Sequence, residues 1–178
     1  MRFQDRIAAL VGLTVAWLAL DSVAQETLKN HYNDPFIQVT TAIKVCPQPR
    51  GPFMTVKEAQ MEAHPRIERG TTCFRAGKCV EPNSYRYDAR IAKAAQFAAD
   101  AAVKKSASLA KSSVWITVQR RFIFVQGCVA DRTQISRWEK VFRQVPEVEY
   151  VGADLAVVVG GKLPPRVPYS VMPVIPSP

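Results

Sequence analysis

Apolar and polar residues alternate with two different periodicities along the middle of the chain. From Asp88, which can cap a helix, an alanine-rich segment (88–111) places apolar residues three and four positions apart, as on one side of a helix. In segments 114–119 and 122–129, apolar residues recur at alternate positions and so share one face, which is typical of strands. Only Arg120 and Arg121 separate them, so the pattern predicts a hairpin.

A second helix and a third strand complete this region. Asp131 opens a helical pattern over 131–144, and 148–159 again alternates like a strand. The order helix, strand, strand, helix, strand predicts a single small α+β sandwich over 86–160, with two helices on one face of a three-stranded sheet.

The flanking regions have a different composition. Residues 25–85 are interrupted by proline and predict an irregular extension held by disulfides, with one short helix over about 55–63. Pro65 restricts the residue before it and is expected to end that helix. Residues 161–178 contain six prolines and predict an extended tail.

The first 24 residues have the pattern of a secretory signal. Arg2 and Arg6 precede an apolar run over 7–20, which is shorter than a membrane span. Small residues before position 25 predict cleavage after Ala24 and export to the periplasm. An uncleaved anchor or a buried helix is the alternative.

The chain is basic, with 24 Lys and Arg against 15 Asp and Glu and a formal charge of +9. Removing residues 1–24 deletes two basic and two acidic residues, so the charge stays at +9. Export disfavours nucleic acid as the partner of this charge. It favours an anionic phospholipid surface.

The four cysteines follow residue 24 and agree with export. An even number in an exported protein predicts disulfides. Cys73 and Cys79 flank a short loop and are expected to pair, which leaves Cys46 to pair with Cys128.

Candidate catalytic and metal-binding groups are sparse. A zinc site using His31 or His64 with cysteines is the alternative to disulfides, but the spacing fits no paired-cysteine motif. Ser112 and Ser113 lack the glycines of a nucleophile elbow. The sequence therefore predicts neither an enzyme nor a cofactor.

The helix predicted over 131–144 is apolar on one side and basic on the other. The basic residues are Arg132, Arg137, Lys140 and Arg143. They are candidates for contact with anionic headgroups, and Arg120 and Arg121 extend this set if the hairpin lies on the same side. The alternative is that the basic side is only solvated while the apolar side, with Trp138, packs on the sheet.

The residue pattern over about 86–160 resembles the BON (bacterial OsmY and nodulation) domain family. The matching positions are Ile116, Val118, Ile123, Val125, Gly127 and Val129 in the hairpin, and Val145, Val148, Val151, Leu155 and Val157 around the third strand. The resemblance implies a non-catalytic module of the cell envelope that associates with phospholipid and supports envelope integrity under stress. Similar small modules in secretion channels imply an alternative, a protein-binding assembly subunit or accessory factor of an envelope machine.

Overall fold

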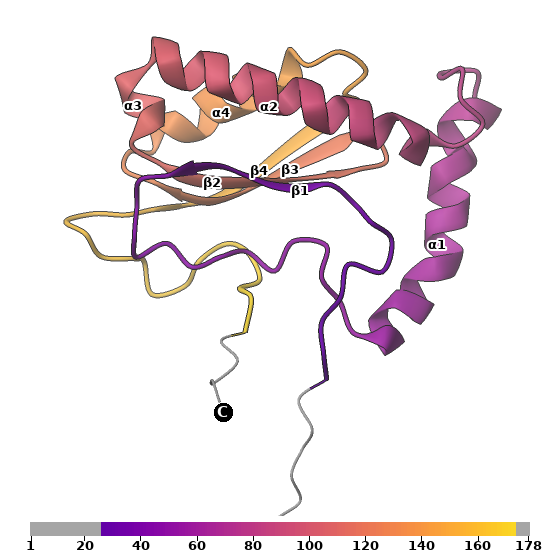
Figure 1. Cartoon of the computed structure of the whole chain (residues 1–178), viewed down its shortest axis with the longest axis horizontal. Helices are drawn as coiled ribbons and strands as arrows, with labels where there is room; N and C mark the ends of the chain where they lie inside the picture. The colour runs from indigo at the N-terminus through magenta and orange to yellow at the C-terminus, as the bar shows by residue number, and fades with distance from the viewer. Residues whose placement is uncertain (1–25, 174–178) are drawn as a thin grey trace, which may run out of the picture.

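The computed structural model describes residues 26–173, so the predicted signal segment and its cleavage site lie outside the described residues. The elements are β1 (Phe36–Thr41), α1 (Val56–Arg75), the 3-10 helix η1 (Ser84–Tyr87), α2 (Asp88–Lys105), α3 (Ala107–Ala110), β2 (Ser113–Gln119), β3 (Phe122–Val129), α4 (Thr133–Arg143) and β4 (Tyr150–Val157). They form a mixed α+β fold (Figure 1).

The strands form one sheet in the order β1-β2-β3-β4. β2 and β3 form the predicted antiparallel hairpin, and β4 lies parallel to β3. A parallel neighbour requires a crossover connection, which α4 supplies. α2 and α4 cover one face of the sheet, while the segment after β1 and the C-terminal tail pass across the other face (Figure 1).

The expectation of a three-stranded sheet was wrong. β1 pairs antiparallel with β2 and adds a fourth strand from the segment that was expected to be irregular. Phe36–Thr41 is rich in aromatic and β-branched residues, which suit a strand. Its backbone pairs with β2, about 75 residues later in the sequence, which is its strand neighbour within residues 26–173.

The main core lies between the helices and the sheet. Ile116, Ile123 and Val125 alternate along the hairpin and are fully buried, as the period-two pattern predicted. Trp138 and Phe142 of α4 are also fully buried. Their rings are stacked with centroids 5.6 Å apart. The predicted apolar side of this helix therefore packs on the sheet.

Both predicted disulfides are present. Cys46–Cys128 joins the segment after β1 to the end of β3, and Cys73–Cys79 closes the turn after α1. The tail packs beside the first bridge, because the Tyr169 hydroxyl donates a hydrogen bond of 3.0 Å to the carbonyl of Pro47. The extension and the tail are thus part of one fold with the sheet.

Two helix boundaries differ from the prediction. α1 starts with the predicted capping box at Thr55 but continues through Pro65 to Arg75. Its second half is held by contacts distant in sequence, including the ion pair of Arg66 and the Cys73 disulfide, and these outweigh the local cost of proline. The long helix from Asp88 ends at Lys105. Ser106 then caps the short helix α3.

Candidate functional site

The four predicted basic residues of α4 and its N-terminal cap point to solvent. Arg132, Arg137, Lys140 and Arg143 are all exposed. Among residues 26–173, Arg143 pairs with Glu139 at 3.5 Å, and the other three form no ion pair. The buried side of the same helix, with Trp138, fixes which way these side chains point.

α2 adds an outward-facing aromatic residue to this layer. Phe97 lies on the side of α2 opposite the buried Ala95 and Ala99, and it is 65% exposed. Lys93 and Lys104, four residues before and seven residues after it, are exposed on the same side. Because α2 and α4 lie over the same face of the sheet, these residues border one surface (Figure 1). We call the exposed sides of α2 and α4 the basic helical face.

Phe97 was not among the site residues predicted from the sequence. The sequence does indicate its exposure, because a helical repeat of 3.6 residues places it on the side of α2 opposite the buried alanines. An aromatic residue in an apolar helix is ordinarily assigned to the core, so the pattern by itself did not single it out.

Arg120 and Arg121 occupy the turn of the β2–β3 hairpin with positive φ values of 56° and 65°. The carboxylate of Asp88 accepts hydrogen bonds from both backbone amides, at 2.7 Å and 2.8 Å. Asp88 is the first residue of α2, but its side chain holds the hairpin and not the helix terminus, which corrects the predicted capping role. Burial raises the pKa of Asp88 to about 6, although the two amide hydrogen bonds act in the opposite direction.

The hairpin arginines differ from the exposed residues of α4. Arg121 is only 15% exposed, and its Nε donates to the carbonyl of Glu147 at 2.8 Å. The guanidinium of Arg120 lies 4.2 Å from the ring centroid of Phe122. Both side chains thus have partners within the fold, so they are not included in the basic helical face.

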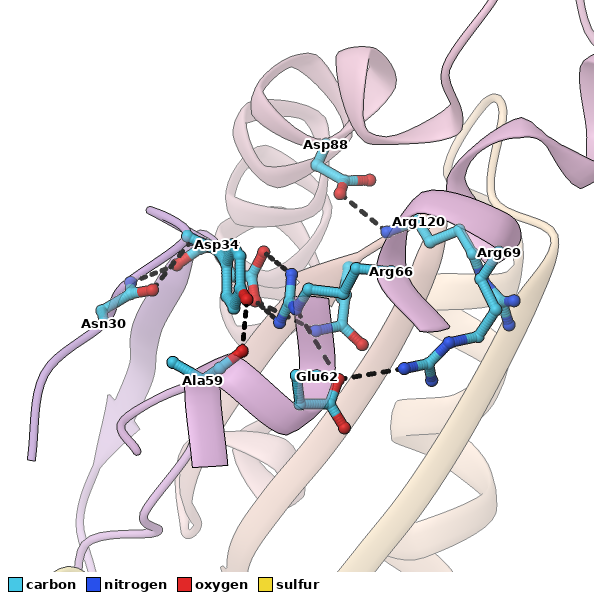
Figure 2. A network of polar contacts seen from close by, with 10 residues as sticks. Asn30, Asp34, Ala59, Glu62, Arg66, Arg69, Asp88 and Arg120 are labelled. Atoms are coloured by element: carbon cyan, nitrogen blue, oxygen red, sulfur yellow. Dashed lines mark hydrogen bonds and ion pairs between the residues drawn. The ribbon is translucent and has the colours of Figure 1, made fainter. Parts of the chain in front are cut away.

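A buried polar network joins α1 to the sheet, and no pattern in the sequence predicted it. Arg66 donates to both carboxylate oxygens of Asp34, at 3.1 Å and 2.6 Å, and Gln119 of β2 donates to the same carboxylate at 3.0 Å. Figure 2 shows Arg66 between Asp34 and Glu62, with Asp88 reaching the backbone of Arg120 nearby. The Arg66 guanidinium also lies 3.9 Å from the ring centroid of Tyr32.

The zinc alternative is excluded because all four cysteines are in disulfides. His64 is exposed on α1, with Nε2 3.2 Å from Glu68. The part of the chain that the structure describes contains no group of three or more His, Cys, Asp or Glu residues that could hold a metal ion.

Two disulfides fit an oxidising extracellular or periplasmic compartment. Over residues 26–173, no helix has both the length and the apolar character needed to cross a membrane.

Comparison of the chain with protein-family models, with characterised proteins and with solved structures gave no significant match.

Proposed function

We propose that this is a non-catalytic protein of the periplasm that binds anionic phospholipid through its basic helical face and supports envelope integrity. The observation that carries the proposal is the exposed basic side of α4, where four basic residues face solvent while the opposite side of the helix is buried in the core. The signal-like N-terminus and the BON-like residue pattern support the same compartment and class of partner.

The chemistry of this face suits a membrane surface. A basic residue near an anionic bilayer contributes about 1 kcal/mol, so Arg132, Arg137, Lys140 and Arg143 together supply a weak attachment of at most about 4 kcal/mol. Phe97 adds an exposed aromatic ring that can enter the interfacial region. Binding that depends on these charges weakens as salt screens them.

Co-sedimentation with lipid vesicles tests the proposal. The protein is expected to bind phosphatidylglycerol-containing vesicles and not phosphatidylcholine vesicles. Replacing Arg132, Arg137, Lys140 and Arg143 with alanine should reduce the binding at least tenfold.

A matched variant separates location from net charge. It carries the same number of alanine substitutions at exposed basic positions outside the basic helical face, namely Lys44, Lys57, Lys162 and Arg166. This control should retain most of the binding. Equal losses in the two variants, or equal binding to neutral and anionic vesicles, would contradict the proposed surface.

A second candidate function is a protein-binding subunit or accessory factor of an envelope machine. Helix α1 favours it, because its large apolar side chains lie at the surface.

A further inference from the structure

Helix α1 buries none of its large apolar side chains in this fold. Its buried residues are Ala59, Arg66, Gly70 and Cys73. By contrast, Val56, Met61, Ile67 and Phe74 are 52%, 63%, 67% and 46% exposed. Most helices in proteins are stabilised by packing of an apolar side. Residues 26–173 therefore leave about half of the surface of these apolar side chains exposed to solvent.

Three of these exposed residues align on one side of the helix. The exposed Ala63 lies on the same side. The order along the helix is then Val56, Ala63, Ile67 and Phe74, with successive spacings of seven, four and seven residues. The line from Val56 to Phe74 spans 18 residues of helix, or about 27 Å at 1.5 Å per residue. We call these four residues the α1 stripe. Its length matches a partner helix of about five turns.

The middle of the stripe borders a groove of about 450 Å³. Ala63 and Ile67 form one wall, and Tyr32, Pro35 and Tyr85 lie among the residues that line it. Within residues 26–173, the buried hydroxyl of Tyr85 has no hydrogen-bond partner. An exposed apolar stripe beside a mainly apolar groove suits the apolar side of an amphipathic helix.

The charges beside the stripe indicate the character of that helix. Lys57 and Arg75 are exposed on the same side of α1, near the two ends of the stripe, and neither forms an ion pair among residues 26–173. Glu68 is exposed on that side too, but its carboxylate lies 3.2 Å from Nε2 of His64. An antiparallel second copy of α1 would bring Lys57 of one chain beside Arg75 of the other, and their repulsion disfavours self-association. Acidic residues on a partner helix would instead pair with both.

We propose that the α1 stripe and its groove bind an amphipathic helix of a partner protein, with the apolar side of that helix on the stripe and acidic residues at its edge. This inference rests on the second candidate function and names its surface and the chemistry of its partner. It does not depend on lipid binding, so the vesicle experiment can fail while this proposal succeeds, and the reverse also holds.

Site-specific photo-crosslinking of the full chain in its native envelope tests the proposal. One variant carries Ile67→p-benzoylphenylalanine. Its matched control carries Met61→p-benzoylphenylalanine, because Met61 is similarly exposed on the same helix but outside the stripe. We expect an adduct at position 67, at least fivefold stronger than at 61, whose crosslinked peptide has helical apolar spacing and net negative charge. An adduct with phospholipid or with a second copy of this chain, a basic partner segment, or no protein adduct at 67 would overturn the proposal.

A second measurement checks that the apolar contact itself is required. The probe is moved to Thr71, beside the stripe, and combined with Ile67→Ser and Phe74→Ser. Both residues are exposed, so the fold should persist, and circular dichroism can verify it. The adduct should fall at least tenfold, while Met61→Ser should leave it within twofold. Equal adducts in the two backgrounds would refute a role for the stripe.

Discussion

Replacing Arg66 with methionine tests how α1 is fixed to the sheet. The guanidinium makes two hydrogen bonds to Asp34, and the side chains of the two residues are only 6% and 3% exposed. Methionine fills similar space but removes the positive charge. The Asp34 carboxylate then remains buried with the amide of Gln119 as its main side-chain partner.

The expected cost follows from this burial. Removing one member of a buried ion pair typically costs about 3–5 kcal/mol, because the remaining charge stays out of water. That is a large part of the 5–15 kcal/mol that typically stabilises a domain. Adding Asp34→Asn to Arg66→Met removes the unpaired charge. The loss of unfolding free energy in the double variant should therefore be smaller than the sum of the losses in the two single variants, by about 2 kcal/mol or more.

Urea unfolding followed by tryptophan fluorescence gives the four free energies of this double-mutant cycle. Arg69→Met is the control, because Arg69 pairs with Glu62 where both side chains are 39% exposed, and its loss should cost less than about 1 kcal/mol. A loss for Arg66→Met as small as that for Arg69→Met, or a coupling below about 0.5 kcal/mol, would refute the reasoning that the buried pair anchors α1.

Three further predictions concern the bridge, the turn and the sheet. Replacing Cys46 and Cys128, which are 82 residues apart, with alanine should lower the free energy of unfolding by about 4.5 kcal/mol in non-reducing denaturant. Replacing Cys73 and Cys79, which are six residues apart, should lower it by about 2 kcal/mol, and the reverse order would contradict the chain-entropy estimate. Burial raises the pKa of Asp88 to about 6, whereas the unfolded value is about 3.9. The folded chain therefore binds more protons than the unfolded chain between about pH 4 and 6, so this group's contribution to the unfolding free energy falls by up to about 3 kcal/mol as pH rises through that window. The difference between wild type and Asp88→Asn should follow this slope, and a flat difference from pH 4 to 7 would count against it. Gly127→Ala should destabilise the protein by at least about 2 kcal/mol in thermal unfolding, because Gly127 has φ +131° and a Cβ there would lie 2.2 Å from the Ser113 carbonyl oxygen; an unchanged melting temperature would show that the hairpin can relax.

Local patterns in the sequence were sufficient for the hairpin and for the packing side of α4. Alternation at Ile123 and Val125, and the helical period that includes Trp138 and Phe142, depend only on neighbouring residues. The disulfide pairing followed from one short loop at Cys73, which left a single remaining pair. These features needed no knowledge of distant contacts.

The missed features depend on contacts between distant segments. β1 exists because β2 offers it backbone partners, and the second half of α1 is held by Arg66 through its pair with Asp34, 32 residues earlier. No local period identifies Asp34 as the partner of Arg66. Pro65 also indicated a helix end, because sequence rules weigh the local cost of proline and not the distant contacts that offset it.

The hairpin turn shows how a nonlocal contact can replace favourable local chemistry. Two consecutive residues with positive φ ordinarily favour asparagine and glycine, and arginine pays a steric cost in that conformation. Here the Asp88 carboxylate binds both turn amides, so the start of α2 stabilises a turn that the sequence Arg120-Arg121 would not favour alone. The sequence therefore predicted the position of the turn but not its conformation.

The two proposed binding surfaces lie on different parts of the molecule, so lipid binding and partner binding can be tested separately. The basic helical face covers one side of the sheet, whereas α1 begins on the opposite side and ends near the start of α2 (Figure 1). If the basic helical face rests on a bilayer, the Val56 end of the α1 stripe points away from the lipid and the stripe remains accessible to a partner. Anionic vesicles should therefore leave crosslinking at Ile67 unchanged, and the fourfold alanine variant of the basic helical face should crosslink as wild type does. Competition between vesicles and the crosslinked partner would mean that both bind one surface, and the assignment of lipid to α4 and protein to α1 would then have to be abandoned.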